Sequence, residues 1–236
     1  FGLYKPGTVE LLNNRIAEEK AILPTLKYNS DVIERIEIFE NDMQNLLMNN
    51  AIEYTRKLSN FGTDEFTIAN STNSISFSDD GKEVNFGGLY TDVIATTRPL
   101  TPKEGISMKY KPTGEDGSWH TIGIRQTSNT VSNVLGCHTY FICFSGPNIE
   151  VQKVQSGLSL SDRIICTVEN KDYVKYNEYN DFEAAAINEP DGVRITLKIN
   201  GQEVINYLDA DNPVREIGYA SIMWNKSDAK LTVRGE

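Results

Sequence analysis

The chain has 236 residues, enough for one β-sandwich of ordinary size with a few dozen residues to spare. It carries 33 acidic and 23 basic residues, for a formal net charge of −10. A surface that is negative on average repels phosphate backbones, so the composition disfavours nucleic acid as a partner. No run of about 18 apolar residues is present, so we expect a soluble chain that does not insert into a membrane.

The N-terminal part of the chain shows helical periodicity. A short amphipathic segment begins at Thr8, and Val9, Leu12 and Ile16 recur on one of its faces. Pro24 should end or interrupt this segment, because proline removes a backbone donor and clashes with the preceding turn.

A second, longer helix is predicted after Pro24. Ser30 and Asp31 have the character of an N-cap, and apolar residues then follow at spacings of three and four as far as Tyr54. This pattern predicts a helix of about 28 residues, roughly 40 Å long. Such a length exceeds the needs of a sandwich, so we expect the helix to pack on a neighbour or on another domain of a parent chain. The alternative is that the helical pair caps the sandwich.

Helical periodicity stops near residue 60 and strand-type alternation follows. We therefore predict a helical segment over residues 1–60 and a β-sandwich over residues 61–236. The turn sequences at residues 70–73 and 79–81 are predicted to form hairpins between short strands. About a dozen strands are predicted in total, which suits two packed antiparallel sheets of jelly-roll type.

The last third of the chain has the clearest strand signals. Residues 193–199 alternate apolar and polar side chains, which predicts a strand with one buried face. Asn200 and Gly201 then favour a type I′ turn, so residues 202–208 should pair back on that strand.

Two further strands are predicted at residues 216–224 and 229–234, joined by a short polar turn. Because no helix separates these elements, we expect residues 182–236 to form a continuous meander.

Two segments of this region resemble a known family. The sequence GVRITLKINGQEVINYLDADNPVREIGYASI resembles the closing hairpins of concanavalin A-like lectin/glucanase (laminin-G-like) domains, and TYFICFSGPNIEVQKV resembles their central hairpin. The resemblance covers about residues 63–236 and implies a concanavalin A-like sandwich. Residues 8–58 resemble the C-terminal helices of extracellular solute-binding proteins, which implies an attachment to a larger protein.

The resemblance does not extend to a catalytic signature. Glucanases of this fold place two carboxylates at alternating positions of one strand, and the corresponding Glu-x-Asp-x-Glu string is absent. Acidic residues elsewhere, such as Glu150, are isolated or lie in polar turns. We therefore predict no catalytic residue, and an enzyme is the less favoured interpretation.

Carbohydrate binding needs aromatic rings that stack on a sugar and polar groups that bond its hydroxyls. The chain offers such residues on three of its predicted strands. The predicted ligand-binding residues are Trp119, His120, Arg125, Tyr140 and Trp224.

No metal site is predicted, because neither histidine has a second ligand at a suitable spacing. We predict no cofactor. Calcium is common in lectins of this superfamily, and Asp79, Asp80, Asp209 and Asp211 could contribute oxygens, although turn residues explain these positions equally well. The three cysteines cannot all pair within one molecule, so we expect small buried thiols and no disulfide framework.

The sequence therefore predicts a non-catalytic carbohydrate-binding module of a secreted or cell-surface bacterial protein. Its expected partners are a neutral polysaccharide or glycan and other domains of a parent chain, in an extracellular or cell-surface location. Two alternatives stay open. One is a glycoside hydrolase or polysaccharide lyase whose acids lie in loops, and the other is a structural or adhesion spacer that binds nothing small.

Overall fold

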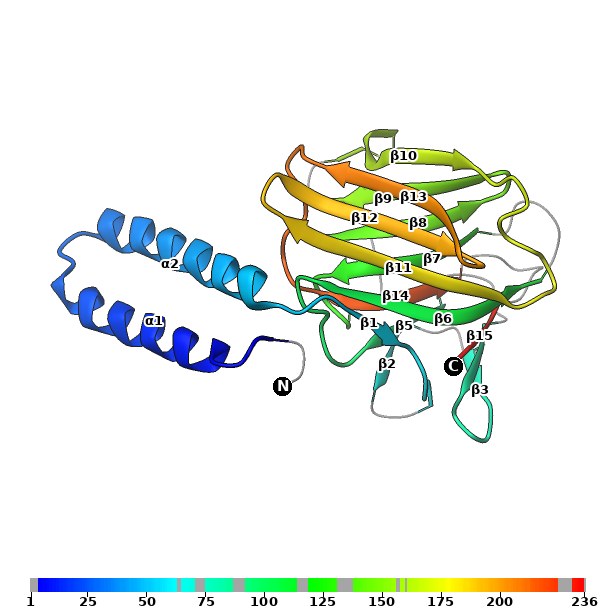
Figure 1. Ribbon diagram of the computed structural model, residues 1–236, viewed down its shortest axis with the longest axis horizontal. Helices are drawn as coiled ribbons and strands as arrows, with labels where there is room; N and C mark the ends of the chain where they lie inside the picture. The colour runs from blue at the N-terminus through cyan, green and yellow to red at the C-terminus, as the bar shows by residue number, and fades with distance from the viewer. Residues whose placement is uncertain are drawn as a thin grey trace. The chain divides into compact units, whose positions relative to one another are not determined.

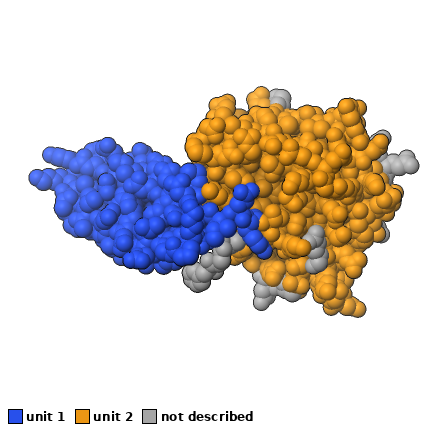
Figure 2. Space-filling view, in the orientation of Figure 1, with its two compact units in different colours: residues 1–54 blue, residues 55–236 orange. Residues whose placement is uncertain are grey.

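The computed structural model describes residues 4–62, 65–70, 75–86, 92–113, 119–130, 138–155, 158–159, 161–224 and 231–235. The chain divides into two compact units, Phe1–Tyr54 and Thr55–Glu236 (Figure 2). The two α-helices belong to the first unit, and the sandwich forms the second. Within the described residues, no helix combines the length and the apolar character that crossing a membrane requires.

The first unit is built from two helices, α1 (Thr8–Ile22) and α2 (Asn29–Asn50), joined through the short 3-10 helix η1 (Leu23–Thr25). Pro24 lies within η1, directly after α1, as its missing amide donor predicts. The two helices run side by side in opposite directions (Figure 1). The predicted pair of helices is therefore present.

The second helix differs from its prediction at both ends. It spans 22 residues instead of about 28. Tyr28 occupies the N-cap without a side-chain hydrogen bond, and the Ser30 hydroxyl donates to Asp31 (3.2 Å) instead of a cap being formed. At the other end the backbone of Ala51 is extended and Tyr54 begins a strand. Apolar spacing alone cannot show that these last residues leave the helix.

The sandwich begins earlier than the predicted residue 61. Strand β1 (Tyr54–Lys57) pairs with β6 (Glu104–Pro112), and the Leu58 amide donates to Ser107 at 2.8 Å. Leu58 and Phe61 are both buried in the main hydrophobic core. Residues 55–60 therefore belong to the sandwich and not to the helical segment.

One sheet of the sandwich has eight strands. They are β1, β3 (Ile75–Phe77), β4 (Glu83–Phe86), β6, β11 (Asn180–Glu189), β12 (Gly192–Ile199), β13 (Gln202–Asp209) and β15 (Leu231–Arg234). Their order is β13-β12-β11-β6-β15-β4-β3, with β1 beside β6. We call this the eight-stranded sheet.

The other sheet has seven strands. They are β2 (Phe66–Asn70), β5 (Asp92–Thr96), β7 (Trp119–Gln126), β8 (Thr139–Ser145), β9 (Asn148–Val154), β10 (Ile164–Glu169) and β14 (Tyr219–Trp224). Their order is β10-β9-β8-β7-β14-β5-β2. Every strand pair whose register the structure gives is antiparallel, and Figure 1 shows the strands of the two sheets packed as layers.

The core lies between the two sheets and follows the period of two that strands require. Ile122 of β7 and Ile142 of β8 face each other in register and are buried. Along β11, Phe182, Ala184 and Ala186 are buried, while the residues between them are half-exposed. This alternation confirms the predicted mainly β, two-sheet antiparallel sandwich.

Local turn signals are confirmed where both flanking strands are described. Asn200 and Gly201 have φ values of 52° and 77°, as a type I′ turn requires, and they join β12 to β13. Gly81, in the turn between β3 and β4, has φ 69°. The hairpin predicted at residues 70–73 is wrong, because β2 and β3 lie in different sheets.

The predicted meander ends at β13. Strands β14 and β15 do not pair with each other, because β14 lies between β7 and β5 and β15 lies between β6 and β4. Each strand thereby gains two hydrogen-bonded neighbours, whereas a terminal hairpin would have left exposed edges. The turn predicted between them lies outside the described residues.

Candidate functional site

A polar cleft of about 410 Å³ lies in the sandwich unit, next to the chain's passage from β1 to β2 and the end of β5. Its volume falls within the range of about 300–1,000 Å³ that is typical of small-molecule sites. The cleft is lined by Arg56, Lys57, Leu58, Ser59, Glu65, Phe66, Thr96, Thr97 and Arg98. Hydroxyl, guanidinium, ammonium and carboxylate groups therefore surround one space.

A buried carboxylate organises the two arginines of this cleft. Glu104 is fully buried, and its Oε1 atom accepts from Arg56 Nε at 2.6 Å and from Arg98 Nη2 at 2.9 Å. Its Oε2 atom accepts from the Thr101 amide at 2.9 Å. Burial acts to raise the pKa of Glu104, but the Arg56 and Thr101 hydrogen bonds and the Arg98 side chain outweigh it, so the pKa is lowered. The carboxylate stays ionised at neutral pH and fixes both guanidinium groups.

The two arginines differ in what they present to the cleft. Arg56 also donates to the carbonyl oxygens of Arg98 (3.1 Å) and Pro99 (2.9 Å), and only 14% of its side chain is exposed. The Arg98 side chain is 52% exposed. Arg56 therefore braces the wall, while Arg98 can offer hydrogen-bond donors to a ligand.

The remaining wall combines hydroxyls with one aromatic ring. Phe66 lies 4.8 Å from Phe61, centroid to centroid, and Phe61 is buried. Packing against Phe61 fixes the Phe66 ring at the wall. Such an arrangement of a fixed ring beside polar groups suits a ligand with one apolar face and several hydroxyls.

The predicted residue Tyr140 is fully buried. Its hydroxyl donates to Asp209 Oδ2 at 2.7 Å and accepts from the Val214 amide at 2.8 Å. Burial, together with the Asp209 carboxylate, raises the pKa of Tyr140. The structure thus gives this tyrosine a role in joining β8 to β13, not a place on a sugar-binding surface.

Arg125 is also buried. Its guanidinium donates to the carbonyl oxygens of Ala186 (2.9 Å from Nε) and Pro102 (2.9 Å) and to the Asn188 side chain (2.5 Å). Burial lowers the pKa of Arg125 to about 10, so the group remains charged at neutral pH. Arg125 ties β7 of one sheet to β11 of the other, and no ligand could reach it without opening the sandwich.

His120 lies in the core next to Phe144. The two rings are stacked, with centroids 4.3 Å apart and an interplanar angle of 9°, and the Tyr110 ring lies 5.4 Å away. Burial lowers the pKa of His120 to about 3, so the imidazole is neutral at physiological pH. The expected contact between His120 and a glycan is therefore not supported.

The two predicted tryptophans can be placed by backbone register only. Trp119 begins β7 opposite Ser145, and Trp224 ends β14 opposite His120. Their side chains lie outside what the structure describes. A role for either ring in ligand binding stays a prediction.

Two of the four aspartates considered for calcium, Asp209 and Asp80, have carboxylates that accept hydrogen bonds from protein groups. The Asp209 carboxylate accepts from Tyr140 and from Lys153 (3.0 Å), and the Lys153 ammonium also donates to the carbonyl oxygen of Asp211 at 2.5 Å. Asp80 accepts from the Ser78 hydroxyl at 2.7 Å. Throughout the described residues, no three His, Cys, Asp or Glu side chains are grouped so as to hold a metal ion.

Two of the cysteines fall within the described residues, and both are free thiols. Burial raises the pKa of Cys143 to about 12, so this thiol is inert at neutral pH. Cys166, on β10, also has a pKa raised by burial. Both therefore behave as packing residues, as expected; Cys137 lies outside the described residues.

Sequence reasoning missed the cleft because its parts are distant in the chain. Arg56 and Glu104 are separated by 48 positions. Neither residue stands in a recognisable motif, and their pairing depends on β1 lying beside β6. No local signal in the sequence could have joined them.

Comparison with known proteins shows similarity at the level of fold. No family model and no curated protein matches the chain. Among solved structures, the Emp46p carbohydrate recognition domain has a TM-score of 0.53 at 8% identity, over 72% of this chain and 86% of its own. A legume lectin-like domain from Entamoeba histolytica has a TM-score of 0.51 at 12% identity, over 72% of this chain and 87% of its own.

A putative glycosyl hydrolase from Parabacteroides distasonis is similar as well, with a TM-score of 0.51 at 14% identity, over 76% of this chain and 96% of its own. Identities this low establish the fold alone. Together with the strand order above, these similarities confirm that the sandwich has the concanavalin A-like lectin/glucanase fold that the sequence predicted.

Proposed function

We propose that residues 55–236 form a carbohydrate-recognition module that binds a glycan without reacting with it. Similarity in fold to a carbohydrate recognition domain and to a legume lectin-like domain supports this role. The observation that carries the proposal is the polar cleft, where hydroxyl, guanidinium and carboxylate groups surround a space beside one fixed aromatic ring.

The chemistry of the cleft matches that of a sugar ring. Arg98 donates to hydroxyl oxygens, and the Ser59 and Thr97 hydroxyls can donate or accept. The Phe66 ring offers an apolar surface for the face of a pyranose. Because Glu104 already fixes Arg98, little side-chain entropy is lost when a ligand binds it.

Binding is favoured over hydrolysis by the state of the buried carboxylate. A glycosidase needs a carboxylic acid whose pKa is raised, so that it can protonate the leaving oxygen. The pKa of Glu104 is lowered, and both of its oxygens already accept hydrogen bonds. This group cannot serve as a proton donor at neutral pH.

We also propose neutral polysaccharide or glycan as the ligand class, since a chain with a net charge of −10 repels polyanions on average. The module would act outside the cell or at its surface, as part of a secreted or surface-attached bacterial protein. Other domains of that protein would be its remaining partners.

The test is a glycan array that carries neutral and acidic glycans, probed with the whole chain and with Arg98→Met. We expect binding to neutral glycans and a loss of about tenfold or more in affinity for Arg98→Met, since charge-assisted hydrogen bonds are removed. Arg194→Met is the matched control, because Arg194, on β12, pairs with Glu189 of β11 and does not line the cleft. Trp119→Ala and Trp224→Ala test the two remaining sequence predictions.

Each outcome separates the alternatives. If only the tryptophan variants lose binding, the module still recognises a glycan, but the binding site lies at the ends of β7 and β14 and not in the cleft. Release of free sugar from a bound glycan would favour a hydrolase or lyase. If no glycan binds at all, the proposal fails and a spacer or adhesion role takes its place.

A further inference from the structure

Arg98 has hydrogen-bond donors that its ion pair leaves unused. Its two terminal nitrogens bind Glu104 end-on, with Nη2 at 2.9 Å from Oε1 and Nη1 at 3.4 Å from Oε2. This contact uses one hydrogen of each terminal nitrogen, so the Nε hydrogen and the second Nη2 hydrogen remain, parallel to each other on one side of the planar group. Among the described residues, none accepts a hydrogen bond from Arg98 Nε. We call these two hydrogens the Arg98 fork.

The fork is held in place at both ends of the residue. The Arg98 carbonyl oxygen accepts from Arg56 Nη1 at 3.1 Å, and Pro99 restricts the backbone before it to extended conformations. At the other end Glu104, which is fully buried, holds the guanidinium. The Arg98 side chain is nevertheless 52% exposed and lines the cleft. A ligand in the cleft therefore meets two donors whose position is already fixed.

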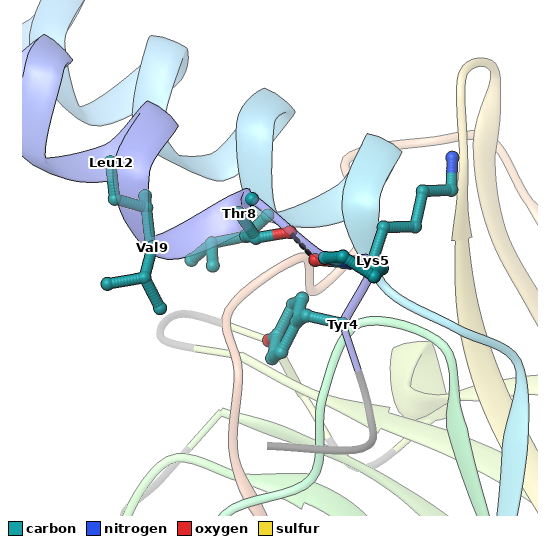
Figure 3. Close-up of a pocket in the computed structure, with 8 residues that line it drawn as sticks. Tyr4, Lys5, Thr8, Val9 and Leu12 are labelled. Carbon is teal, nitrogen blue, oxygen red and sulfur yellow. Dashed lines mark hydrogen bonds between the residues drawn. The ribbon is translucent and has the colours of Figure 1, made fainter.

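A hollow of about 300 Å³ in the helical unit shows the contrast with this cleft. Val9 and Leu12 belong to its largely apolar lining (Figure 3). Its Thr8 hydroxyl donates to the Lys5 carbonyl oxygen at 2.6 Å, drawn as a dashed line in Figure 3, and the Lys5 ammonium donates to the Asn49 carbonyl oxygen at 2.8 Å. These polar groups are bonded within the helical unit. The unused donors of the cleft make it the better place to look for ligand specificity.

The charges around the fork decide which pair of oxygens it suits. Arg56, Lys57 and Arg98 bring three positive charges to the cleft, and Glu65 and the buried Glu104 bring two negative ones, so the cleft is close to balanced. Because the charge of Arg98 is already paired with Glu104, the fork acts mainly as two hydrogen-bond donors. Two neutral oxygens satisfy both donors without bringing a further carboxylate to a chain whose net charge is −10.

We propose that the Arg98 fork determines the specificity of the cleft by binding two adjacent hydroxyl groups of a neutral pyranose. This inference rests on the proposed function, since it assumes that a neutral glycan occupies the cleft. Each hydroxyl oxygen accepts one hydrogen of the fork, in the paired geometry that a guanidinium group imposes. A lysine at this position would still pair with Glu104, but its ammonium has no parallel pair of donors on a planar group.

The test is an NMR titration of the isotope-labelled whole chain with the methyl glycosides of glucose, galactose and mannose. Their 2-, 3-, 4- and 6-deoxy derivatives each remove one hydroxyl, and the methyl glycoside of glucuronic acid adds a carboxylate to the same ring. Arg98→Lys keeps the charge and removes the fork. Arg194→Lys is the matched control, because Arg194 also binds both oxygens of a carboxylate, that of Glu189, at 2.8 and 3.0 Å, and does not line the cleft.

We expect two deoxy positions, adjacent on the ring, to weaken binding to the wild-type chain about tenfold each, because each leaves a charged donor unpaired. Arg98→Lys should weaken the parent sugar about tenfold. In this variant the same two deoxy sugars should bind within about twofold of the parent, because the group that distinguished them is gone. Losses at other ring positions should be the same in both chains, and Arg194→Lys should behave as the wild type.

The inference is overturned, and glycan recognition stands, if the sugars bind but Arg98→Lys binds them as tightly as the wild type, or if no adjacent pair of deoxy losses disappears in that variant. Tighter binding of the glucuronoside than of the glucoside would also overturn it, since the fork would then bind a carboxylate. So would glycans that bind on the array when no methyl glycoside binds in solution. If no sugar binds in either experiment, the proposed function fails together with this inference.

Discussion

The ammonium of Lys153 lies 3.0 Å from the Asp209 carboxylate inside the sandwich, where both side chains are almost completely buried. Lys153 belongs to β9 of the seven-stranded sheet and Asp209 ends β13 of the eight-stranded sheet. The ammonium also donates a hydrogen bond to the Asp211 carbonyl oxygen, so one charged group bonds both a carboxylate and the backbone that follows β13. The pair thus joins the two layers through a polar contact within a largely apolar core.

Replacing Lys153 by methionine should destabilise the sandwich strongly. The substitution keeps the length of the side chain but leaves the Asp209 charge buried beside Tyr140 alone, and breaking a buried pair in this way costs about 3–5 kcal/mol. Urea unfolding followed by tryptophan fluorescence measures the change. Lys171→Met is the control, because the Lys171 side chain is 70% exposed and lies 3.7 Å from Glu169. Comparable losses in the two variants would contradict a structural role for the buried pair.

The contrast between local and distant contacts explains what the sequence could predict. Asn200 and Gly201 specify their turn by conformation alone, so the hairpin between β12 and β13 could be read without any tertiary information. The alternation along β12 likewise identified its buried face. These local signals were enough to predict a two-sheet sandwich.

The sheet assignment of a strand carries no such local signal. The sequence predicts strands at β14 and β15, yet only the competition among all available edges places them in different sheets. The same limit applied to the candidate site. Three of the predicted binding residues have side chains suited to sugars, namely His120, Arg125 and Tyr140. All three are buried in the structure, because the packing of the two sheets covers the faces of the strands on which they lie.

Gly218→Ala should also be strongly destabilising. A Cβ atom at this position would lie 2.4 Å from the carbonyl carbon of Arg125 and 2.6 Å from the carbonyl oxygen of Gln126. Both are backbone atoms next to the register shift between β14 and β7, so neither can rotate away. We expect a loss of about 1–3 kcal/mol or more, measured by thermal and urea unfolding.

Gly62→Ala provides the comparison for that variant. The nearest atom to a Cβ at Gly62 is the Gly81 Cα at 3.2 Å, and the next lies on the Phe77 side chain at 3.7 Å. A shift of a few tenths of an ångström accommodates these contacts, so the loss should be much smaller. If the two alanine variants were equally stable, close backbone approach at Gly218 would not be the constraint inferred here.

The buried histidine should make the stability of the sandwich depend on pH. The pKa of His120 is about 3 in the folded chain, whereas an unfolded histidine titrates near 6.5. Between these pH values the unfolded chain binds one more proton than the folded chain. The free energy of unfolding is therefore highest above about pH 6.5 and falls as the pH decreases. The unfolding equilibrium constant should rise by up to tenfold per pH unit from this residue alone.

His120→Phe keeps a ring on Phe144 while removing the titrating group, so it should abolish this contribution. Urea unfolding between pH 5 and 7 gives the slope, in a range above the pH at which carboxylates such as Glu104 take up protons. His138→Gln is the control, because the His138 side chain is 40% exposed and lies 3.3 Å from Glu216. It is the only other histidine of the chain, so any remaining slope in this range can be assigned. A wild-type slope that persists in His120→Phe and disappears in His138→Gln would show that the exposed histidine, and not the buried one, controls stability in this range.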